Sequence, residues 1–440
     1  MSGRYLAPEE TMDPALRDEL VLAKLRRQVE YVWERSPFYR RLWGDAGVNP
    51  EMLQTLADLR RFPLVTKDAI RRDQAETPPF GSNLCCDPAD VSRIHGTSGT
   101  TGRPVLFAVS REDWIRIGAT HGRIMWSFGI RPGDSVFLAS YFSLYMGSWG
   151  ALAGAEALGA TVFPYGAGVP GQTERALVYL EFVRPTVFYG TPSYALHLAN
   201  VAEAHDVDPR QLGFRIMFFS GEAGAGIATT KARIESTFGA LCVDTGSMAE
   251  MTPWMTNAEC DERTGMHLWD DIVYTEIVDR ETLEPIGGDG EGVPVYTHLE
   301  RSSQPMIRLL SGDLTRVTSE PCPCGRTYRR LPEGIYGRID DMLVLRGANV
   351  YPHVIENVLR GVPGLGSEYR LIVERPDELD LLTIECEAPD AGVASAVAER
   401  VQRAIGLRAA VTIHPVGTLP TTEFKARRVI DRRAAEPAGA

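Results

Sequence analysis

The sequence lacks the features that mark several protein classes. It contains no run of about 18 apolar residues, the length that a membrane-spanning helix needs. Its N-terminus lacks the charged and then apolar layout of a signal peptide. Positive charge is in deficit, with 46 Lys and Arg against 58 Asp and Glu and a formal net charge of −12, which argues against general binding to nucleic acids or anionic membranes. These absences predict a cytoplasmic protein whose partners are small molecules.

Two common nucleotide-binding motifs are also absent. No Gly-x4-Gly-Lys-Ser/Thr segment occurs, and no Gly-x-Gly-x-x-Gly segment opens a helix. Residues 96–103 instead read Gly-Thr-Ser-Gly-Thr-Thr-Gly-Arg. Because glycines let backbone N–H groups approach an anion and hydroxyl groups can bond its oxygens, this segment is a candidate phosphate-binding loop. A Ser/Thr/Gly surface loop between strands is the alternative, and other segments must decide between the two.

Seven cysteines, an odd number, favour free thiols or metal ligands over a disulfide framework in a long chain without a secretory signal. Cys260 and His267 stand seven residues apart, and Cys322 and Cys324 form a second close pair in Cys-Pro-Cys-Gly. Three thiols and an imidazole match the tetrahedral ligand set of structural zinc, although the spacing of the second pair is tighter than usual. Buried free cysteines are the alternative.

Hydrophobic periodicity divides the 440 residues into regions. The first 65 residues are expected to be helical. From 92 to 244, strand-like apolar runs alternate with helical patterns, which predicts a mostly parallel sheet covered on both faces. Residues 272–317 indicate an antiparallel subdomain, and the last hundred residues alternate strands with helices.

The predicted fold class is therefore α/β. A large N-terminal domain, residues 1–338, contains mostly parallel βαβ sheets and a β-rich subdomain at about 255–335, and residues 339–440 form a small mobile α+β C-terminal domain. Ligands of parallel sheets collect beyond the carboxyl ends of the strands. The strand-then-turn junctions at 219–224 and 243–247 are candidate walls of one site.

An ordered set of motifs covers nearly the whole chain. It comprises residues 36–41, the loop at 97–104, Gly-Thr-Pro-Ser at 190–193, Ser-Gly-Glu at 220–222, the glutamate at 250, residues 265–270, residues 306–314, Gly-Arg-Ile-Asp-Asp-Met at 337–342, residues 346–352 and Phe-Lys at 424–425. This set resembles the adenylate-forming superfamily of acyl-coenzyme A synthetases, most closely its phenylacetate-coenzyme A ligase branch. One hydroxyl-rich loop is weak evidence, whereas so many motifs in the same order are strong evidence.

The resemblance implies a ligase with a two-step reaction. A carboxylate attacks the α-phosphate of ATP to give an acyl-adenylate and pyrophosphate, and the thiol of coenzyme A then displaces AMP. Because two anions meet in the first step, the site needs cations, Mg²⁺ and donors that already point at the phosphates. The implied substrate is an aromatic or cyclic carboxylic acid. The alternative is an adenylating enzyme that passes the acyl group to a carrier protein or an amine.

The resemblance also assigns roles to single residues. Lys425 would bridge the carboxylate and the α-phosphate, where negative charge builds up. Glu250 would bind Mg²⁺, because this hard cation prefers oxygen ligands. The nucleotide would contact a larger set: Thr97, Ser98, Gly99, Thr100, Thr101, Gly102, Arg103, Ser220, Gly221, Glu222, Asp244, Thr245, Asp313 and Arg338.

Two further positions would serve the second half-reaction. Asp340 would be the hinge about which the C-terminal domain rotates, and Gly347 would let the pantetheine arm of coenzyme A pass close to the backbone. A tight turn is the structural alternative for Gly347. A non-catalytic nucleotide sensor is disfavoured, because Lys425, Glu250 and Asp313 are all present. Dimers are common in the branch, so a homodimer is expected.

The segment at 244–250 departs from the pattern of the branch, in which it typically reads Asp-x-Tyr-Gly-x-Ser-Glu. Here Gly246 replaces the aromatic residue, Ser247 the glycine and Ala249 the hydroxyl residue. Loss of the hydroxyl is expected to weaken or move a phosphate contact. Loss of the ring is expected to widen the acyl pocket, which predicts an acid larger than phenylacetate or differently substituted. Three aromatic residues that follow a predicted strand are expected to line this pocket, with ordinary packing as the alternative: Tyr141, Phe142 and Tyr145.

Overall fold

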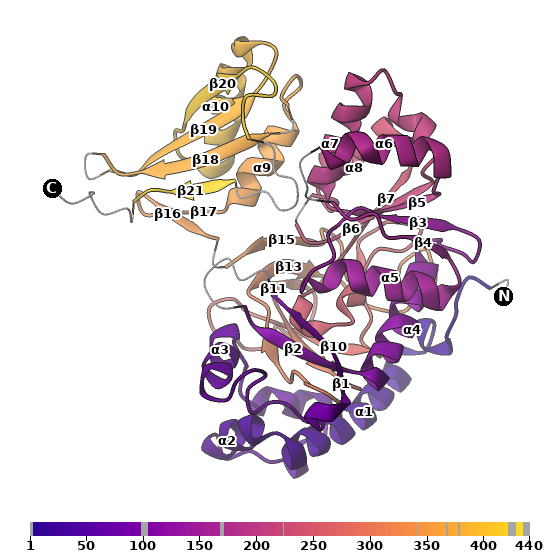
Figure 1. The fold of residues 1–440 in the computed structure, drawn as a ribbon. Coiled ribbons are helices and arrows are strands. Elements are labelled where there is room, and N and C mark those ends of the chain that lie inside the picture. The colour runs from indigo at the N-terminus through magenta and orange to yellow at the C-terminus, as the bar shows by residue number, and fades with distance from the viewer. Residues whose placement is uncertain are drawn as a thin grey trace.

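The computed structural model describes residues 3–97, 104–167, 171–222, 224–339, 341–366, 368–376, 379–420 and 428–433. A large N-terminal part and a smaller C-terminal part lie side by side (Figure 1). Predicted site residues outside the described part of the chain are Lys425, Asp340, Ser98, Gly99, Thr100, Thr101, Gly102 and Arg103. Among the helices that the structure describes, none combines the length and the apolar character needed to cross a membrane.

The N-terminal region is helical, as the sequence predicts. It contains α1 (Pro14–Arg35), α2 (Pro37–Asp45) and α3 (Lys67–Glu76). Each helix begins after a residue whose side chain accepts a backbone N–H of the first turn: Asp13, Ser36 and Thr66. One face of α1 is buried at helical spacing through Val21, Leu25, Val29 and Val32.

A sheet of eight strands forms the centre, in the order β14-β9-β8-β7-β6-β5-β3-β4. Its parallel strands are β3 (Ser135–Leu138), β4 (Thr161–Phe163), β5 (Val187–Gly190), β6 (Ile216–Phe219) and β7 (Leu241–Gly246). Three antiparallel strands extend it: β8 (Asn257–Ala258), β9 (Met266–Leu268) and β14 (Arg330–Leu331). These three come from the segment in which the sequence predicts a separate β-rich subdomain.

Helices cover both faces of this sheet, which confirms the βαβ prediction. Val136 and Leu138 of β3 pack with α4 (Arg111–Ser127) and α5 (Met146–Leu158). Phe137, whose side chain points to the opposite face, packs in the core that contains three other helices. These are α6 (Gln172–Val183), α7 (Pro192–Ala204) and α8 (Ala228–Phe238).

Two smaller β units lie beside the central sheet. One is the antiparallel hairpin of β1 (Val91–Gly96) and β2 (Leu106–Ser110). The other confirms the antiparallel prediction and contains β10 (Val273–Val278), β11 (Gly290–His298), β12 (Leu309–Leu310), β13 (Asp313–Val317) and β15 (Ile335–Arg338).

The C-terminal part is α+β, as predicted. Its four-stranded sheet has the order β20-β19-β18-β21. The strands are β18 (Tyr369–Glu374), β19 (Leu381–Glu387), β20 (Ala410–His414) and β21 (Val429–Asp431). Two helices pack in the same apolar core, α9 (Pro352–Arg360) and α10 (Ala394–Ile405), and a small hairpin of β16 (Leu343–Leu345) and β17 (Ala348–Val350) precedes them.

Candidate active site

The hairpin of β1 and β2 carries the candidate phosphate loop between its strands. The backbone N–H of Thr97 donates to the carbonyl of Val105 over 3.0 Å, and the Val105 N–H donates to the Thr97 hydroxyl over 3.1 Å. The N–H of Gly96 donates to the carbonyl of Leu144 over 2.9 Å, which ties the hairpin to the segment after β3. Thr97 and Val105 therefore hold the two ends of the loop together. Thr97 is one of the residues predicted to contact the nucleotide.

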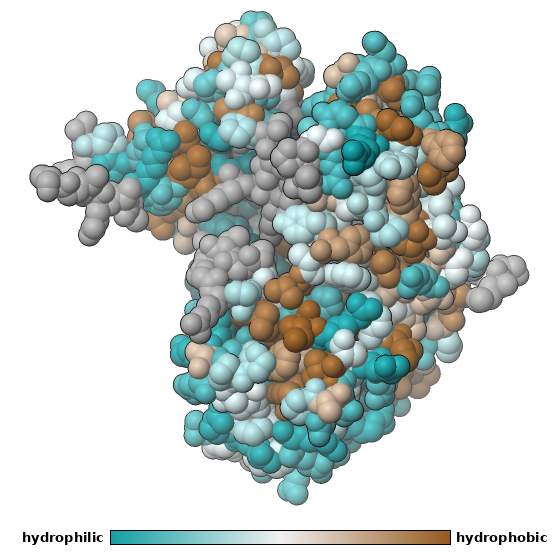
Figure 2. Space-filling view, viewed as in Figure 1, coloured by the Kyte–Doolittle hydropathy of each residue, from teal (hydrophilic) through white to brown (hydrophobic). Residues whose placement is uncertain are grey.

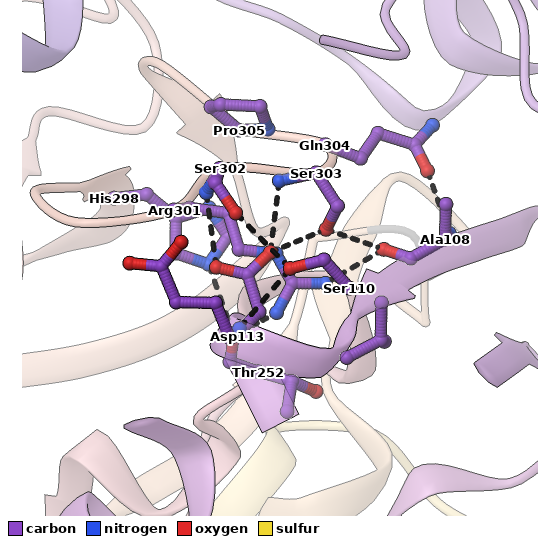
Figure 3. A network of polar contacts seen from close by, with 12 residues as sticks. Ala108, Ser110, Asp113, Thr252, His298, Arg301, Ser302, Ser303, Gln304 and Pro305 are labelled. Atoms are coloured by element: carbon purple, nitrogen blue, oxygen red, sulfur yellow. Dashed lines mark hydrogen bonds and ion pairs between the residues drawn. The ribbon is translucent and has the colours of Figure 1, made fainter. Parts of the chain in front are cut away.

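Side chains occupy the outer edge of β2. Gln74 both accepts from the N–H and donates to the carbonyl of Leu106, over 3.1 and 2.7 Å. Gln304 accepts from the Ala108 N–H over 2.9 Å, and Ser303 and Arg301 donate to the Ala108 carbonyl (Figure 3). An unpaired strand edge would leave these backbone groups without partners. The two glutamines thus hold the strand that follows the loop.

Asp113, in the first turn of α4, anchors the segment that contacts β2. Its carboxylate accepts backbone N–H groups of Ser302 and Ser303 over 2.9 and 2.8 Å and lies 3.4 Å from Nε of Arg301 (Figure 3). Burial opposes ionisation of this carboxyl group, but the Arg301 charge and the hydrogen bonds outweigh it and lower the pKa of Asp113 to about 2. An ionised aspartate therefore fixes residues 301–303.

The predicted nucleotide residues meet at the carboxyl ends of parallel strands. Phe219 of β6 is in register with both Gly190 of β5 and Asp244 of β7, so the residues that follow these strands lie next to one another. The Thr245 hydroxyl donates to the Phe219 carbonyl over 2.7 Å. The Ser220 hydroxyl lies 2.8 Å from the hydroxyl of Tyr189, a residue that the sequence analysis did not single out.

Gly221 and Glu222 follow Ser220 in this turn. Gly221 has a positive φ of 92°, and a Cβ there would lie 2.9 Å from the Tyr145 hydroxyl, so both its conformation and its surroundings favour glycine. The Glu222 carboxylate accepts the backbone N–H of Ser193 at the start of α7 over 2.7 Å. The Ser-Gly-Glu segment is therefore fixed against two neighbouring elements.

Asp244 is buried beside a second carboxylate. Its backbone N–H donates to Glu259 over 2.8 Å, and Lys231 lies 2.6 Å from both oxygens of Glu259. Burial and the charge of Glu259 raise the pKa of Asp244 well above its usual range. A cavity of about 180 Å³ opens beside these residues, and a Cβ on Gly226 or Gly334 would lie 2.6 or 2.9 Å from Asp244 Oδ2.

Asp313 and Arg338 form a pair across neighbouring strands. They are directly opposite in the register of β13 and β15, and Arg338 Nη1 donates to Asp313 Oδ1 over 2.7 Å. Asp313 is buried, whereas the Arg338 side chain is one-third exposed. The structure thus brings together two of the residues predicted to contact the nucleotide.

Glu250 lies in a short 3₁₀ turn (Ala249–Met251) after β7, with its side chain almost fully buried. Its Oε1 is 3.2 Å from Nζ of Lys67, which opens α3. A buried carboxylate suits a hard divalent cation, so this residue fits the predicted Mg²⁺ role. The sequence analysis missed Lys67. The signal that could have found it is the scarcity of lysine, since the chain contains only four.

Gly246, where the acyl pocket is predicted to widen, is the last residue of β7, and Ser247 follows it directly. A Cβ on Gly246 would meet no described atom within 4 Å, and the buried Ser247 hydroxyl has no hydrogen-bond partner among the described residues. The Tyr145 hydroxyl bonds with Ser220 and Tyr189.

Tyr141 is partly exposed, and Phe142 packs edge-on against Trp149 with ring centroids 4.9 Å apart. Trp254, which the sequence analysis did not single out, lies 5.8 Å from the Tyr189 ring. Gly347, the predicted coenzyme A contact, stands in the turn between β16 and β17 with a φ of 81°.

The four predicted zinc ligands come together in a buried cluster. Their candidate ligand atoms all lie within 4.8 Å of one another: Cys260, His267, Cys322 and Cys324. The Cys260 and Cys322 sulfurs are 3.8 Å apart, and the Cys324 sulfur is 3.4 Å from His267 Nε2. The pairing of β9 with β14 places these distant segments side by side, with His267 opposite Arg330.

Comparisons with known proteins match most of the chain. The family model described as AMP-binding enzyme matches residues 44–294, and the model described as AMP-binding enzyme C-terminal domain matches residues 347–433. A phenylacetate-coenzyme A ligase of Thermus thermophilus is 33% identical, with 95% of this chain and 96% of the relative covered. One from Escherichia coli is 32% identical, with 98% and 99% covered.

Solved structures of a 2-hydroxyisobutyryl-CoA ligase are also similar. In its postadenylation state with 2-HIB-AMP, that enzyme matches with a TM-score of 0.94 and 47% identity, covering 98% of this chain and 93% of that one. In its thioesterification state, with 2-HIB-AMP and CoA, the TM-score is 0.77 at 48% identity and the same coverage. An open conformation gives 0.78 at 47% identity, covering 98% and 95%.

Proposed function

Because the chain belongs to the AMP-binding enzyme family, we propose how its residues carry out the family reaction and which acid they take. The chain is an AMP-forming acid–thiol ligase, which activates a carboxylic acid as an acyl-adenylate and transfers the acyl group to coenzyme A. The observation that carries the proposal is the pairing of β6 with β7 at the carboxyl edge of the central sheet, where the Ser220–Glu222 turn and Glu250 follow these strands, together with the Asp313–Arg338 pair.

In the first half-reaction, the residues around this edge bind and orient ATP. Asp313 accepts hydrogen bonds from the ribose hydroxyls, and Arg338, already bonded to Asp313, contacts the nucleotide. The loop after Thr97 holds the β- and γ-phosphates through backbone N–H groups and hydroxyls. Lys425 places its positive charge between the acid and the α-phosphate. Positive charge and hydrogen-bond donors from these groups would stabilise the negative charge of the transition state.

Mg²⁺ is the cofactor that Glu250 would hold. When bound, the ion neutralises charge on the triphosphate. Lys67 supplies a second positive charge at the same carboxylate. Lys67 would thus add to the positive charge available to the end of ATP that leaves as pyrophosphate.

The second half-reaction requires coenzyme A to reach the adenylate. Asp340 is the proposed hinge for rotation of the C-terminal domain, and Gly347 lies in the turn past which the pantetheine arm is proposed to run. The open space above Gly347, where a Cβ would meet no described atom within 4 Å, supports this assignment.

The acid is proposed to be aromatic or cyclic. The open space at Gly246 and the tyrosines at 141 and 145 support a flat or bulky acyl group, and the curated relatives are phenylacetate ligases. A compact branched 2-hydroxy acid is the second candidate. The 47% identity to the 2-hydroxyisobutyryl-CoA ligase favours it, and the Ser247 hydroxyl, which bonds to no described residue, offers a partner for a substrate hydroxyl.

A structural zinc ion is proposed for the buried cluster of Cys260, His267, Cys322 and Cys324. The donor set fits, because three thiolates and an imidazole within 4.8 Å of one another match a closed tetrahedral site. The ion would join the Cys-Pro-Cys-Gly turn to β9 and so fix one end of the central sheet. It would lie outside the reacting centre and would supply stability, not chemistry.

A homodimer is proposed as the oligomeric state. Several large apolar side chains of α6 are exposed, and Figure 2 shows apolar residues at the surface in this region. They are Val178, Tyr179, Phe182 and Val183. Light scattering of the wild type and of Phe182→Ser tests the dimer and this face.

The experiment that tests the function measures acid-dependent release of pyrophosphate from ATP, and then thioester formation with coenzyme A. The panel contains phenylacetate, a bulkier aryl acid, cyclohexanecarboxylate and 2-hydroxyisobutyrate. We expect at least one acid to drive both steps. Preference for 2-hydroxyisobutyrate would replace the aromatic proposal with the second candidate. Absence of release with every acid would refute adenylation of these acid classes.

A further inference from the structure

Arg428 is the first described residue after Lys425, three positions farther along the chain, and it directly precedes β21. Its side chain is mostly buried among groups of the C-terminal part. The guanidinium lies 3.5 Å from Glu356 and 3.7 Å from Glu368, and its carbon stands 4.6 Å from the centre of the Tyr369 ring. These contacts fix Arg428 within its own domain.

The same guanidinium reaches the N-terminal part. Its Nη2 donates to the hydroxyl of Ser193 over 3.3 Å. The backbone N–H of Ser193 in turn donates to Glu222 of the Ser-Gly-Glu turn, and the Glu222 charge also acts on Arg428. One cation therefore links acidic groups of both parts, while Glu356 has a second partner in Arg360, 3.1 Å away.

The contact depends on how the two parts are arranged. The chain matches the postadenylation state of the 2-hydroxyisobutyryl-CoA ligase with a TM-score of 0.94, but its thioesterification and open states with only 0.77 and 0.78. Since sequence identity is nearly the same in all three comparisons, the difference lies in conformation. A domain rotation would carry Glu356 and Tyr369 along with Arg428, whereas Ser193 and Glu222 would stay behind.

We propose that Arg428 is a positioning residue for adenylation. By bonding Ser193 and facing Glu222, it holds the C-terminal domain in the arrangement in which the segment that contains Lys425 serves the nucleotide site. The contact breaks when the domain moves for transfer to coenzyme A. This inference rests on the proposed adenylation chemistry, and it predicts that the two half-reactions depend on Arg428 to different extents.

The test compares half-reactions in Arg428→Met and Ser193→Ala. Pyrophosphate release with ATP and the preferred acid reports the first step. Thioester formation from pre-formed acyl-adenylate and coenzyme A reports the second step without ATP. We expect Arg428→Met to slow the first step by about tenfold and Ser193→Ala by about threefold, the range for losing a charge-assisted hydrogen bond that is partly exposed to water. The second step should stay within about twofold of the wild type.

Arg432→Met is the matched control. Arg432 lies in the same tail, is exposed and pairs only with Glu374 of its own domain among the described residues, so both half-reactions should be unchanged. Equal slowing of both steps in Arg428→Met, together with a lowered Tm, would assign the residue to domain stability and overturn the proposal, as would an unaffected first step. A wild type without acid-dependent pyrophosphate release would instead refute the proposed function.

Discussion

The Nζ of Lys67 lies 3.2 Å from Oε1 of Glu250, which joins the first turn of α3 to the buried turn after β7. The carboxylate is almost fully buried, whereas the lysine side chain is about one-third exposed. A buried carboxylate is costly without a partner, and Lys67 supplies a partner for Glu250. The same positive charge faces the region proposed to receive the triphosphate.

Lys67→Met should therefore weaken productive binding of ATP. We expect the KM for ATP to rise and kcat/KM for ATP to fall by about tenfold, because one charge-assisted contact is lost. The measurement is the ATP dependence of pyrophosphate release. Lys24→Met is the control, since Lys24 pairs with Glu300 away from this edge. Unchanged ATP kinetics in Lys67→Met would mean that this lysine serves only to stabilise Glu250.

Asp113 should give the folded state a defined acid sensitivity. Its folded pKa of about 2 lies below the value of about 3.9 for an unfolded chain, so its contribution to stability is complete above about pH 4 and disappears as pH falls through 2. Urea unfolding of the wild type and Asp113→Asn should differ most at pH 6. The difference should shrink by about 1 kcal/mol by pH 3.

A pH-independent difference between these two proteins would contradict the ionised state of Asp113. Exposed Asp68→Asn is the control for the general effect of removing one carboxylate, and it should leave the slope of stability against pH nearly unchanged, because its partner Arg71 is also exposed.

Gly246→Phe should narrow the acyl pocket. Its Cβ would point into open space, so we expect the variant to fold, with catalytic efficiency for the bulkiest acid accepted falling by about tenfold or more and that for the smallest changing less. Steady-state kinetics over the acid panel measures this. Gly246→Ala controls for the backbone change, because it adds only one carbon. If Gly246→Phe lowered the efficiency for every acid equally, the glycine would not border the acyl pocket.

Removal of zinc should destabilise the chain. We expect about one zinc per chain in metal analysis and a fall in Tm of about 5 °C or more after chelation or in Cys324→Ser, because a bound ion adds its binding free energy to folding. Cys86→Ser is the control, since Cys86 lies outside the cluster and is only partly buried. Protein that contains no zinc and keeps the same Tm after chelation would contradict the proposed zinc site.

Local patterns predicted the course of the chain well. The capped helix α1, the strand-like runs of β3, β5 and β6, and the C-terminal helices occur where periodicity predicts them. Periodicity depends only on residues that are close in sequence. It therefore predicts a helix or strand without knowledge of the element that packs against it. The motif order was likewise sufficient to identify the family.

The pairing of strands, in contrast, could not be predicted from local patterns. The segment at about 255–335 was predicted to form one β-rich subdomain, yet β8, β9 and β14 extend the central sheet while β10, β11, β13 and β15 form another. The period of two places side chains on faces but does not say which edge a strand will join. The three short strands extend the central sheet beyond β7. Their pairing brings His267 next to Cys322 and Cys324.

The sequence by itself determined the chemical types available to this protein: a hydroxyl-rich loop, a glutamate and an aspartate in matching motifs, a scarce lysine near the C-terminus and a Cys₃His set. Only the tertiary structure decided that Lys67 meets Glu250, that Gln74 and Gln304 hold β2, and that Arg428 contacts Ser193. Residue types are local properties, whereas these contacts depend on strand register and on packing between distant elements.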